Sequence, residues 1–363
     1  EIYFGMGGFL QASLVVLFIA LLFHVYTRLD INRVVYNHEP GQCTIVDGPT
    51  DGSEDIEVVE HLSIAFVSSE IHYLSCKRNG PGKIFLYDFS SNSARKEAKS
   101  LKITGETFDA ANFHPHGITH WIVNGVVRLY VINHDNHFRH SVEAFDFDEK
   151  SRTLKHVKTF KDPALIKPND IAAVGEDQFV FSNDGVCQTE TMGLLEMLSG
   201  WRGGSVYYYD SKTYHELLSG RASPNGVAYD GRSGTLFVSI IMDRLIEAYH
   251  FDKSTVSLSL LSSIPVYSSC DNLSLHKPRT LLTGCHPITH KVLRSLQDCK
   301  NHELTAPSQV LKLDYSDDYS TAKITEMYSN DGTQLTGSSA AVLFDKQLLV
   351  GTVHRNLLHC ALP

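Results

Sequence analysis

Short apolar and aromatic runs dominate the chain after residue 40. Each run is four to seven residues long, is rich in β-branched and aromatic side chains, and is bounded by Gly, Asn, Asp or Pro, as β-strands are. One amphipathic stretch, Glu190–Trp201, predicts a helix instead. The pattern therefore predicts an all-β protein, with strands at Lys83–Tyr87, Val126–Ile132, Gln178–Phe181, Gly204–Tyr209, Thr235–Ser239, Gln309–Leu313 and Gln347–Val350.

Small polar signatures recur at a longer period than the strands. Successive signatures are separated by 61, 53, 56, 46 and 67 residues, which is about the length of one four-stranded blade. Six signatures predict a six-bladed β-propeller in which each signature lies where the chain enters a blade near the central axis. The positions counted are Asp55, His116, Asn169, Asn225, Asp271 and Ser338.

The segment from Gly5 to Tyr26 contains no Lys, Arg, Asp or Glu. Its 22 residues can cross a bilayer core of roughly 30 Å as a helix. A cleaved secretory signal is the alternative interpretation, but the apolar part is long and no small-residue cleavage site follows it. We therefore expect a short tail at residues 1–4, a transmembrane helix at residues 5–27 and a propeller domain at residues 28–363. Arg28 and Arg33 alone would favour a cytosolic C-terminus.

The formal net charge of −9 and the pI near 6.1 argue against nucleic acid as the main partner, because phosphate binding requires a basic face. The excess of carboxylates either keeps the surface soluble or in part reflects a site for a hard cation.

Seven cysteines are present, and no two of them form a C-x-x-C pair, so a zinc site has no support. A bond between Cys43 and Cys360 would join the two ends of the soluble part and would persist only in an oxidising compartment. Seven free thiols are the alternative. The odd count leaves at least one free thiol. The pairing of Cys76, Cys187, Cys270 and Cys299 stays open. The sequon at Asn272 is expected to be buried and unglycosylated.

The signatures bring together carboxylate and amide oxygens and no sulfur. Calcium takes six to eight oxygen ligands and accepts Asn and backbone carbonyls, whereas magnesium prefers octahedral sites with several waters. If the signatures converge on one tunnel, their donors therefore predict a calcium site. The donors are Glu54, Asp55, Asn169, Asp170, Asn225, Asp271 and Asn272.

Several phrases of the chain resemble those of the animal paraoxonases, in order and at matching spacing over about residues 25–362. Members of this family are six-bladed propellers with two central calcium ions, an N-terminal membrane-associating helix and a disulfide joining the ends. They act on lactones, aryl esters and some organophosphates. The phrases include Gly52-Ser-Glu-Asp-Ile-Glu57, Phe113-His-Pro-His-Gly-Ile118, Pro168-Asn-Asp-Ile171, Asp271-Asn272, Gly284-Cys-His-Pro287 and Leu349-Val-Gly-Thr352.

The resemblance implies a role for each matching residue. The catalytic calcium would be held by Glu54, Asn169, Asn225, Asp271 and Asn272, and the structural calcium by Asp55, Asp170 and the carbonyl of Ile118. Cys43 and Cys360 match the family's disulfide pair, and Cys285 matches its free thiol. His116 and His134 match a His dyad proposed to activate water, and Asp271 is the alternative base or nucleophile.

The match departs from the family at positions that would line the substrate pocket: Gly185, Ser223, and Ile288–Thr289. Two hypotheses follow. The first is a calcium-dependent lactonase or aryl esterase, anchored by one helix, with its propeller in the endoplasmic reticulum lumen or outside the cell. The second is a non-catalytic accessory or chaperone-like subunit of a degenerin-type sodium channel, which some nematode paraoxonase-like proteins resemble. The retained His116, His134 and Asp271 favour the first.

Overall fold

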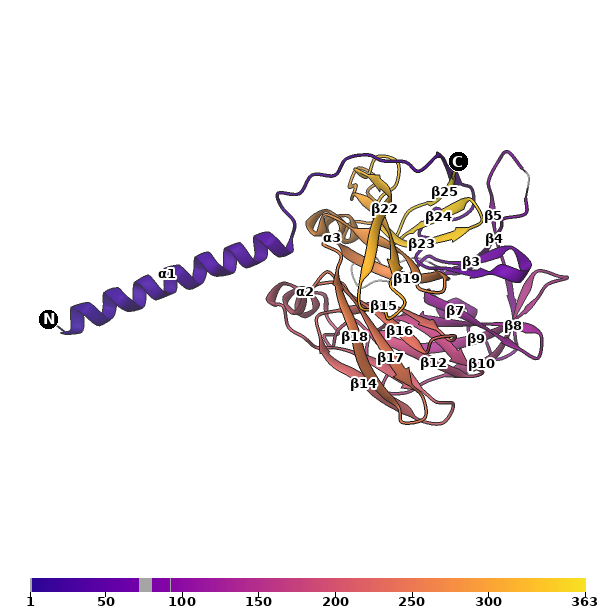
Figure 1. The fold of residues 1–363 in the computed structure, drawn as a ribbon, viewed down its shortest axis with the longest axis horizontal. Coiled ribbons are helices and arrows are strands. Elements are labelled where there is room, and N and C mark those ends of the chain that lie inside the picture. Colours follow the sequence, from indigo (N-terminus) through magenta and orange to yellow (C-terminus); the bar gives the residue numbers. More distant parts are fainter. Residues whose placement is uncertain (1, 72–79, 92) are drawn as a thin grey trace.

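Six β-sheets surround a central axis in the computed structural model, which describes residues 2–71, 80–91 and 93–363 (Figure 1). The predicted all-β, six-bladed propeller is thereby confirmed. The first three blades, each given from its inner strand outward, are β2 (Ile56–Val59), β3 (Ile64–Ser69), β4 (Lys83–Asp88) and β5 (Ala98–Ser100); β7 (Pro115–Val123), β8 (Val126–His134), β9 (His140–Asp148), β10 (Thr153–Phe160) and β6 (Lys102–Thr104); and β11 (Pro168–Gly175), β12 (Gln178–Asn183), β13 (Gly204–Tyr209) and β14 (Tyr214–Arg221).

The remaining blades have four strands each. They are β15 (Pro224–Asp230), β16 (Thr235–Ile240), β17 (Leu245–Asp252) and β18 (Ser257–Pro265); β19 (Ser269–Lys277), β20 (Thr280–His286), β21 (Ser308–Tyr315) and β22 (Ala322–Asn330); and β23 (Ser338–Phe344), β24 (Gln347–Thr352), β25 (Leu357–Ala361) and β1 (Gln42–Val46). All seven strands predicted from the apolar runs are present. Two single-turn helices, η1 (Glu60–Leu62) and η2 (Ala110–Asn112), lie in loops.

The innermost strands contact one another around the axis, from β2 to β7, β11, β15, β19, β23 and back to β2. Two glycines permit this close approach. A Cβ at Gly117 would lie 2.6 Å from the Cα of Asp170 in the next blade, and a Cβ at Gly226 would lie 2.4 Å from the carbonyl oxygen of Asp271. A side chain at either position would push neighbouring blades apart, which explains the His-Gly and Asn-Gly dipeptides of the signatures.

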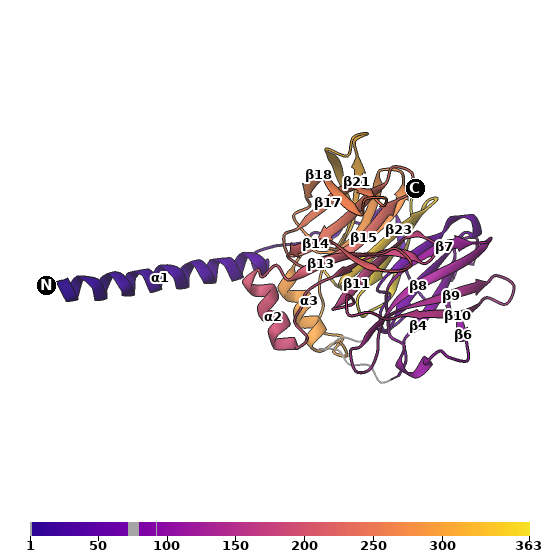
Figure 2. The ribbon, with the colours of Figure 1, turned by 90° about the horizontal axis from the view of Figure 1, so that it is seen from below.

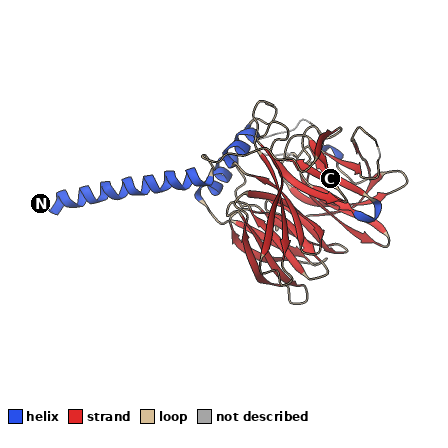
Figure 3. Ribbon diagram, turned by 45° about the horizontal axis from the view of Figure 1, so that its top comes forward, coloured by secondary structure: helices blue, strands red, loops and turns tan. Residues whose placement is uncertain are grey.

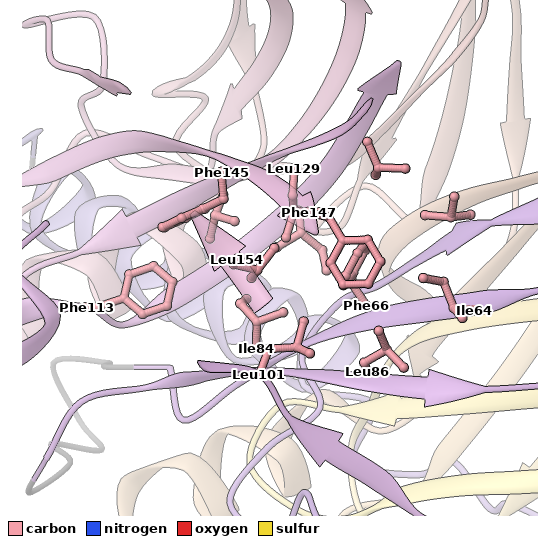
Figure 4. Packing of buried hydrophobic residues seen from close by; sticks show 14 residues of the cluster. Ile64, Phe66, Ile84, Leu86, Leu101, Phe113, Leu129, Phe145, Phe147 and Leu154 are labelled. Carbon is pink, nitrogen blue, oxygen red and sulfur yellow. The ribbon is translucent and has the colours of Figure 1, made fainter. Parts of the chain in front are cut away.

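Apolar side chains fill the space between adjacent blades. Figure 4 shows the cluster between the first two blades, where Phe66 and Phe147 meet edge to face with their ring centroids 5.1 Å apart. Ile84, Leu129 and Leu154 complete the contact and are fully buried. The core therefore lies between the sheets, which leaves the axis free for polar residues.

The last blade combines the two ends of the propeller. β1 pairs antiparallel with β25, and Cys43 lies directly opposite Cys360 in this pairing. The two cysteines form a disulfide. The first strand of the domain is thereby fixed to the last one, so the ring of blades is closed both by a β-ladder and by a covalent bond.

A long helix, α1 (Ile2–Arg28), extends away from the propeller (Figures 1 and 3). Its segment Gln11–Arg28 has a mean hydropathy of 1.5 and no buried residue, and it is long and apolar enough to cross a membrane. Two residues after the end of α1, Asp30 packs against the propeller and is only 3% exposed. Asp30 accepts hydrogen bonds from the backbone nitrogen and hydroxyl of Thr289, at 3.3 and 2.8 Å.

Two further helices lie beside the end of α1 (Figure 2). The helix predicted at Glu190–Trp201 is α2 (Glu190–Ser199), which begins after the capping hydroxyl of Thr189 and ends at Gly200 in the left-handed region. The sequence did not predict α3 (Thr289–Gln297). Its N-cap residue, Ile288, provides no side-chain cap, and the cap is supplied by Asp30 from the other end of the chain.

Candidate metal centre and active-site cavity

The predicted metal ligands converge at the starts of the innermost strands. Glu54 and Asp55 directly precede β2, Ile118 lies in β7, and the other ligands belong to β11, β15 and β19. No ligand side chain is more than 6% exposed. We call the predicted ligands of the catalytic calcium the cage. They are Glu54, Asn169, Asn225, Asp271 and Asn272.

Four cage oxygens are buried without a hydrogen-bond donor among the residues that the structure describes. They are the Oδ1 atoms of Asn169, Asn225, Asp271 and Asn272. The orientation of Asn272 is fixed because its Nδ2 donates to the backbone carbonyl of Glu54 at 2.9 Å. A buried acceptor without a donor costs about 1–3 kcal/mol, and more if it is charged. A hard cation would satisfy all four oxygens, so this donor set fits calcium.

The second predicted set, Asp55 and Asp170, links neighbouring blades. Asp55 Oδ2 accepts the backbone N–H of Ile118 at 2.8 Å, and Asp170 Oδ2 accepts that of Val227 at 2.7 Å. Burial raises the pKa of Asp55 to about 8, and burial followed by the charge of Asp55 raises the pKa of Asp170 well above its usual value. A nearby cation would favour the charged form of both groups.

No three His, Cys, Asp or Glu side chains within the described ranges are grouped closely enough to bind a metal by themselves. The cage relies on asparagine oxygens for three of its five members, so it falls outside such a grouping. Carboxylate and amide oxygens together are a donor set of calcium rather than of zinc or copper.

The two predicted histidines are in contact with each other and with the cage. His116 Nδ1 lies 2.9 Å from His134 Nε2, and His116 Nε2 lies 3.3 Å from Glu54 Oε1. Burial, with smaller contributions from nearby cationic and histidine groups, lowers the pKa of His134 well below its usual value, so this ring is neutral. His134 is thus a neutral imidazole in contact with the Nδ1 side of His116.

The predicted Asp271 has a partner that the sequence did not reveal. Its Oδ2 lies 2.9 Å from Nε2 of His286, which is 6% exposed. Burial, followed by the charge of Glu54, raises the pKa of Asp271, while His286 opposes this effect. His286 could have been found from its position next to Cys285, because β20, which carries both residues, pairs with β19, which carries Asp271.

The expectation that Cys285 is a free thiol is wrong. Cys285 forms a disulfide with Cys270, its direct partner in the pairing of β19 with β20. The resemblance implied a thiol without a partner at this position, whereas Cys270 occupies the facing site on β19. Cys299 is also disulfide-bonded, and Cys187 is the free thiol of the described residues. Cys76 lies outside the described residues.

A cavity of about 480 Å³ opens over the two histidines. One side is formed by α2 and α3, which we call the helical wall; it contributes Leu194, Met197, Leu293 and Leu296. Lys167 also lines the cavity and pairs with Asp184 at 2.9 Å, and this carboxylate raises the pKa of Lys167. The cavity is apolar on the helical side and polar on the side of the histidines.

The positions at which the sequence departs from the family, Gly185, Ser223, Ile288 and Thr289, are not among the residues that line this cavity. The carboxylate of Glu196 in α2 accepts the backbone N–H groups of Val186 and Cys187 in the loop after β12, and a Cβ at Gly185 would lie 2.7 Å from this carboxylate. Thr289 is the residue through which Asp30 caps α3. Two of the altered positions therefore serve to place the helical wall. Ser223 adopts a positive φ of 59° before β15, and nothing in the structure explains the choice of serine there.

The chain is thus a closed six-bladed β-propeller with buried oxygen donors at the starts of its inner strands, two contacting histidines and an apolar cavity. Comparison with known proteins specifies the family. The Arylesterase family model matches residues 34–362. The chain is 32% identical to serum paraoxonase/arylesterase 2 of Gallus gallus, over 98% of this chain and 100% of that one. It is 31% identical to serum paraoxonase/lactonase 3 of Homo sapiens, over 92% and 93%. The chain therefore belongs to the paraoxonase (arylesterase) family.

Solved structures of low sequence identity share the fold. A calcium-binding protein, regucalcin from Agrobacterium tumefaciens, matches with a TM-score of 0.53 at 10% identity, over 90% of this chain and 96% of that chain. A luciferin-regenerating enzyme matches with a TM-score of 0.52 at 11% identity, over 88% and 94%. At such identities the likeness concerns the fold alone.

Proposed function

We propose that the chain is a calcium-dependent hydrolase of lactones or aryl esters. The observation that carries the proposal is the set of four buried cage oxygens that lack a donor within the described part of the chain, next to the His116–His134 pair. Membership in the family supports the same activity, since relatives are named paraoxonase, arylesterase and lactonase. Glu54, Asn169, Asn225, Asp271 and Asn272 would hold the catalytic ion.

When bound, the calcium ion would supply a Lewis acid that polarises the substrate carbonyl. The chain's own residues do the rest. His116 takes a proton from the attacking water, because its ring lies between the cage and the cavity. His134 orients His116 through the 2.9 Å contact. The helical wall binds the apolar part of the substrate and excludes water from it.

A second ion would be held by Asp55, Asp170 and the carbonyl of Ile118. Asp55 and Asp170 already connect adjacent blades through backbone N–H groups. An ion at this place would offset the charge of two buried carboxylates, so its role would be structural. Asp271 is the alternative base or nucleophile, and its contact with His286 would keep it oriented in either role.

We further propose that α1 anchors the protein in a membrane and that the propeller lies in the lumen or outside the cell. No residue in the apolar window of α1 is buried, and α2, which contacts α1, exposes Met192 and Leu195, as does the following loop with Trp201. The disulfides of Cys43 with Cys360 and of Cys270 with Cys285 favour an oxidising compartment. Protease protection in sealed microsomes tests the orientation: digestion of the propeller without detergent would contradict it.

The exposed helix is also what favours the alternative, an accessory subunit of a degenerin-type channel, since a bare transmembrane helix can pack on a partner's helices. One experiment separates the two. The full-length protein in detergent is assayed with aliphatic and aromatic lactones and phenyl acetate, with calcium or with a chelator, together with the variants His116→Gln and Asp271→Ala. His137→Gln is the matched control because His137 is exposed and lies outside the cavity.

Calcium-dependent turnover that both active-site variants abolish and the control retains would establish the hydrolase. A folded, calcium-loaded protein without turnover on any of these substrates would refute it and leave the accessory role.

A further inference from the structure

A third histidine continues the His116–His134 pair. His134 is the last residue of β8 and His140 is the first residue of β9, and the two lie directly opposite each other in the strand pairing. His134 Nδ1 is 2.8 Å from His140 Nδ1, and the rings meet edge to face at 4.8 Å between centroids. His116, His134 and His140 therefore form one continuous chain of contacts that begins at Glu54.

His140 borders two cavities. It lines the active-site cavity, and it also lines a second cavity of about 280 Å³ between the loop before η2 and the outer part of the same blade. The second cavity is polar, and its lining includes Asp135, Glu143, Thr159 and Lys161. His140 Nε2 is buried, and it neither donates nor accepts a hydrogen bond among the described residues. A cavity of this size and polarity has room for water molecules beside His140.

Neutral imidazoles allow only two consistent arrangements of the chain, because each ring has one N–H and one lone pair. Burial keeps His134 neutral, and burial also lowers the pKa of His140 to about 4. In one arrangement every N–H points toward Glu54, so that His116 Nε2 is protonated. In the other, every N–H points away from Glu54, and His116 Nε2 carries the lone pair that a base needs.

The second arrangement needs an acceptor behind His134. His116 Nδ1–H donates to His134 Nε2, and His134 Nδ1–H must then donate to a lone pair, which His140 Nδ1 provides. The proton of His140 is then on Nε2. Removing His140 leaves His134 Nδ1–H without its acceptor and removes the reason for the base-competent arrangement.

We propose that His140 is a positioning residue that sets the hydrogen-bond polarity of the His116–His134 pair, so that His116 Nε2 carries the lone pair needed to activate water. This inference rests on the proposed hydrolase function and deepens it. His140 touches neither the substrate carbonyl nor the cage in this role; it acts through His134, as the third member of a catalytic triad acts through its histidine.

The test uses the full-length protein in detergent with ring-¹⁵N-labelled histidine, and compares wild type with His140→Ala and His140→Gln. Gln offers a carbonyl oxygen in place of the lost lone pair. His137→Gln is the control, because His137 is an exposed histidine three residues away. We expect His140→Ala to lower kcat about 10- to 100-fold with KM within about twofold. His140→Gln should recover most of this loss, and the control should match wild type.

The nitrogen spectra provide a readout independent of turnover. In wild type, His116 Nε2 should resonate as an unprotonated nitrogen, and in His140→Ala this signal should shift toward the protonated position. A protonated His116 Nε2 in wild type, or an alanine variant with unchanged kcat and unchanged His116 signals, would overturn the inference. If wild type hydrolyses none of the substrates, the proposed function fails, and the spectra still decide whether His140 sets the tautomer of His116.

Discussion

The cage and the helical wall enclose the same site but are built in different ways. Each cage residue lies at or next to the start of an innermost strand, where the contacts of neighbouring blades fix the backbone. The helical wall consists of α2 and α3, which are placed by local devices: the Thr189 cap, Gly185 against Glu196, and Asp30 on Thr289. The cage is therefore set by the propeller itself, whereas the wall can change without altering the cage.

The largest effect should come from the cage. Asn225→Leu replaces a buried acceptor with an apolar group of similar size, and it should abolish both the stabilisation by calcium and calcium-dependent turnover, by at least about 10³-fold. A ligand at 100 times its Kd adds about 2.7 kcal/mol to the free energy of unfolding. Thermal unfolding with calcium and with a chelator measures this difference. Asn37→Leu, at an exposed position, should keep the full calcium response; an Asn225→Leu protein that keeps it too would remove Asn225 from the cage.

The next effect concerns the disulfide behind the cage. Cys270 precedes Asp271 and Cys285 precedes His286, so the bond holds together the two strands that carry the 2.9 Å Asp271–His286 contact. The double variant Cys270→Ala/Cys285→Ala should lose about 3 kcal/mol of unfolding free energy, the value for a loop of about 15 residues. It should also bind calcium more weakly. Urea unfolding and calcium titration measure the two effects.

The free thiol provides the control for that experiment. Cys187→Ala removes a cysteine without removing a disulfide, and it should unfold at the urea concentration of wild type. Equal calcium affinity in the double variant and wild type would show that the inner strands hold Asp271 and His286 without the covalent bond.

A change in the helical wall should affect substrate binding and leave calcium binding intact. Met197 lines the cavity, whereas Met192 on the same helix is 52% exposed and does not. Met197→Ala should raise KM for apolar lactones about tenfold, which corresponds to about 1.4 kcal/mol of lost burial, with little change in kcat. Met192→Ala should leave both constants unchanged. A lower calcium affinity in Met197→Ala would contradict the separation of wall and cage.

The same contrast explains how much the sequence could reveal. The cage residues could be proposed from the sequence because the blades repeat, and because Asn169 and Asn225 stand in similar phrases one blade apart. The cap of α3 could not be found, since Asp30 lies 259 residues from Thr289 in sequence. The Cys270–Cys285 bond and the His134–His140 contact depend on strand register, which short apolar runs do not specify. The sequence therefore predicts the residues that recur at the start of each blade, and it misses the contacts that depend on strand register or on residues distant in sequence.

The smallest effect is a pH dependence of the propeller body, away from both cage and wall. His359 in β25 is 3% exposed, its Nε2 lies 3.1 Å from Gln347 Oε1, and burial lowers its pKa to about 4. The unfolded chain binds a proton on this residue near pH 6.5, so the unfolded state holds more protons between pH 6.5 and 4. Stability is therefore complete above pH 6.5 and falls as the pH decreases toward 4. His359→Gln should flatten this loss in urea unfolding at pH 7 and pH 5, while His61→Gln, at an exposed position, should retain the wild-type slope. An unchanged slope in His359→Gln would contradict this and assign the acid sensitivity to other buried groups.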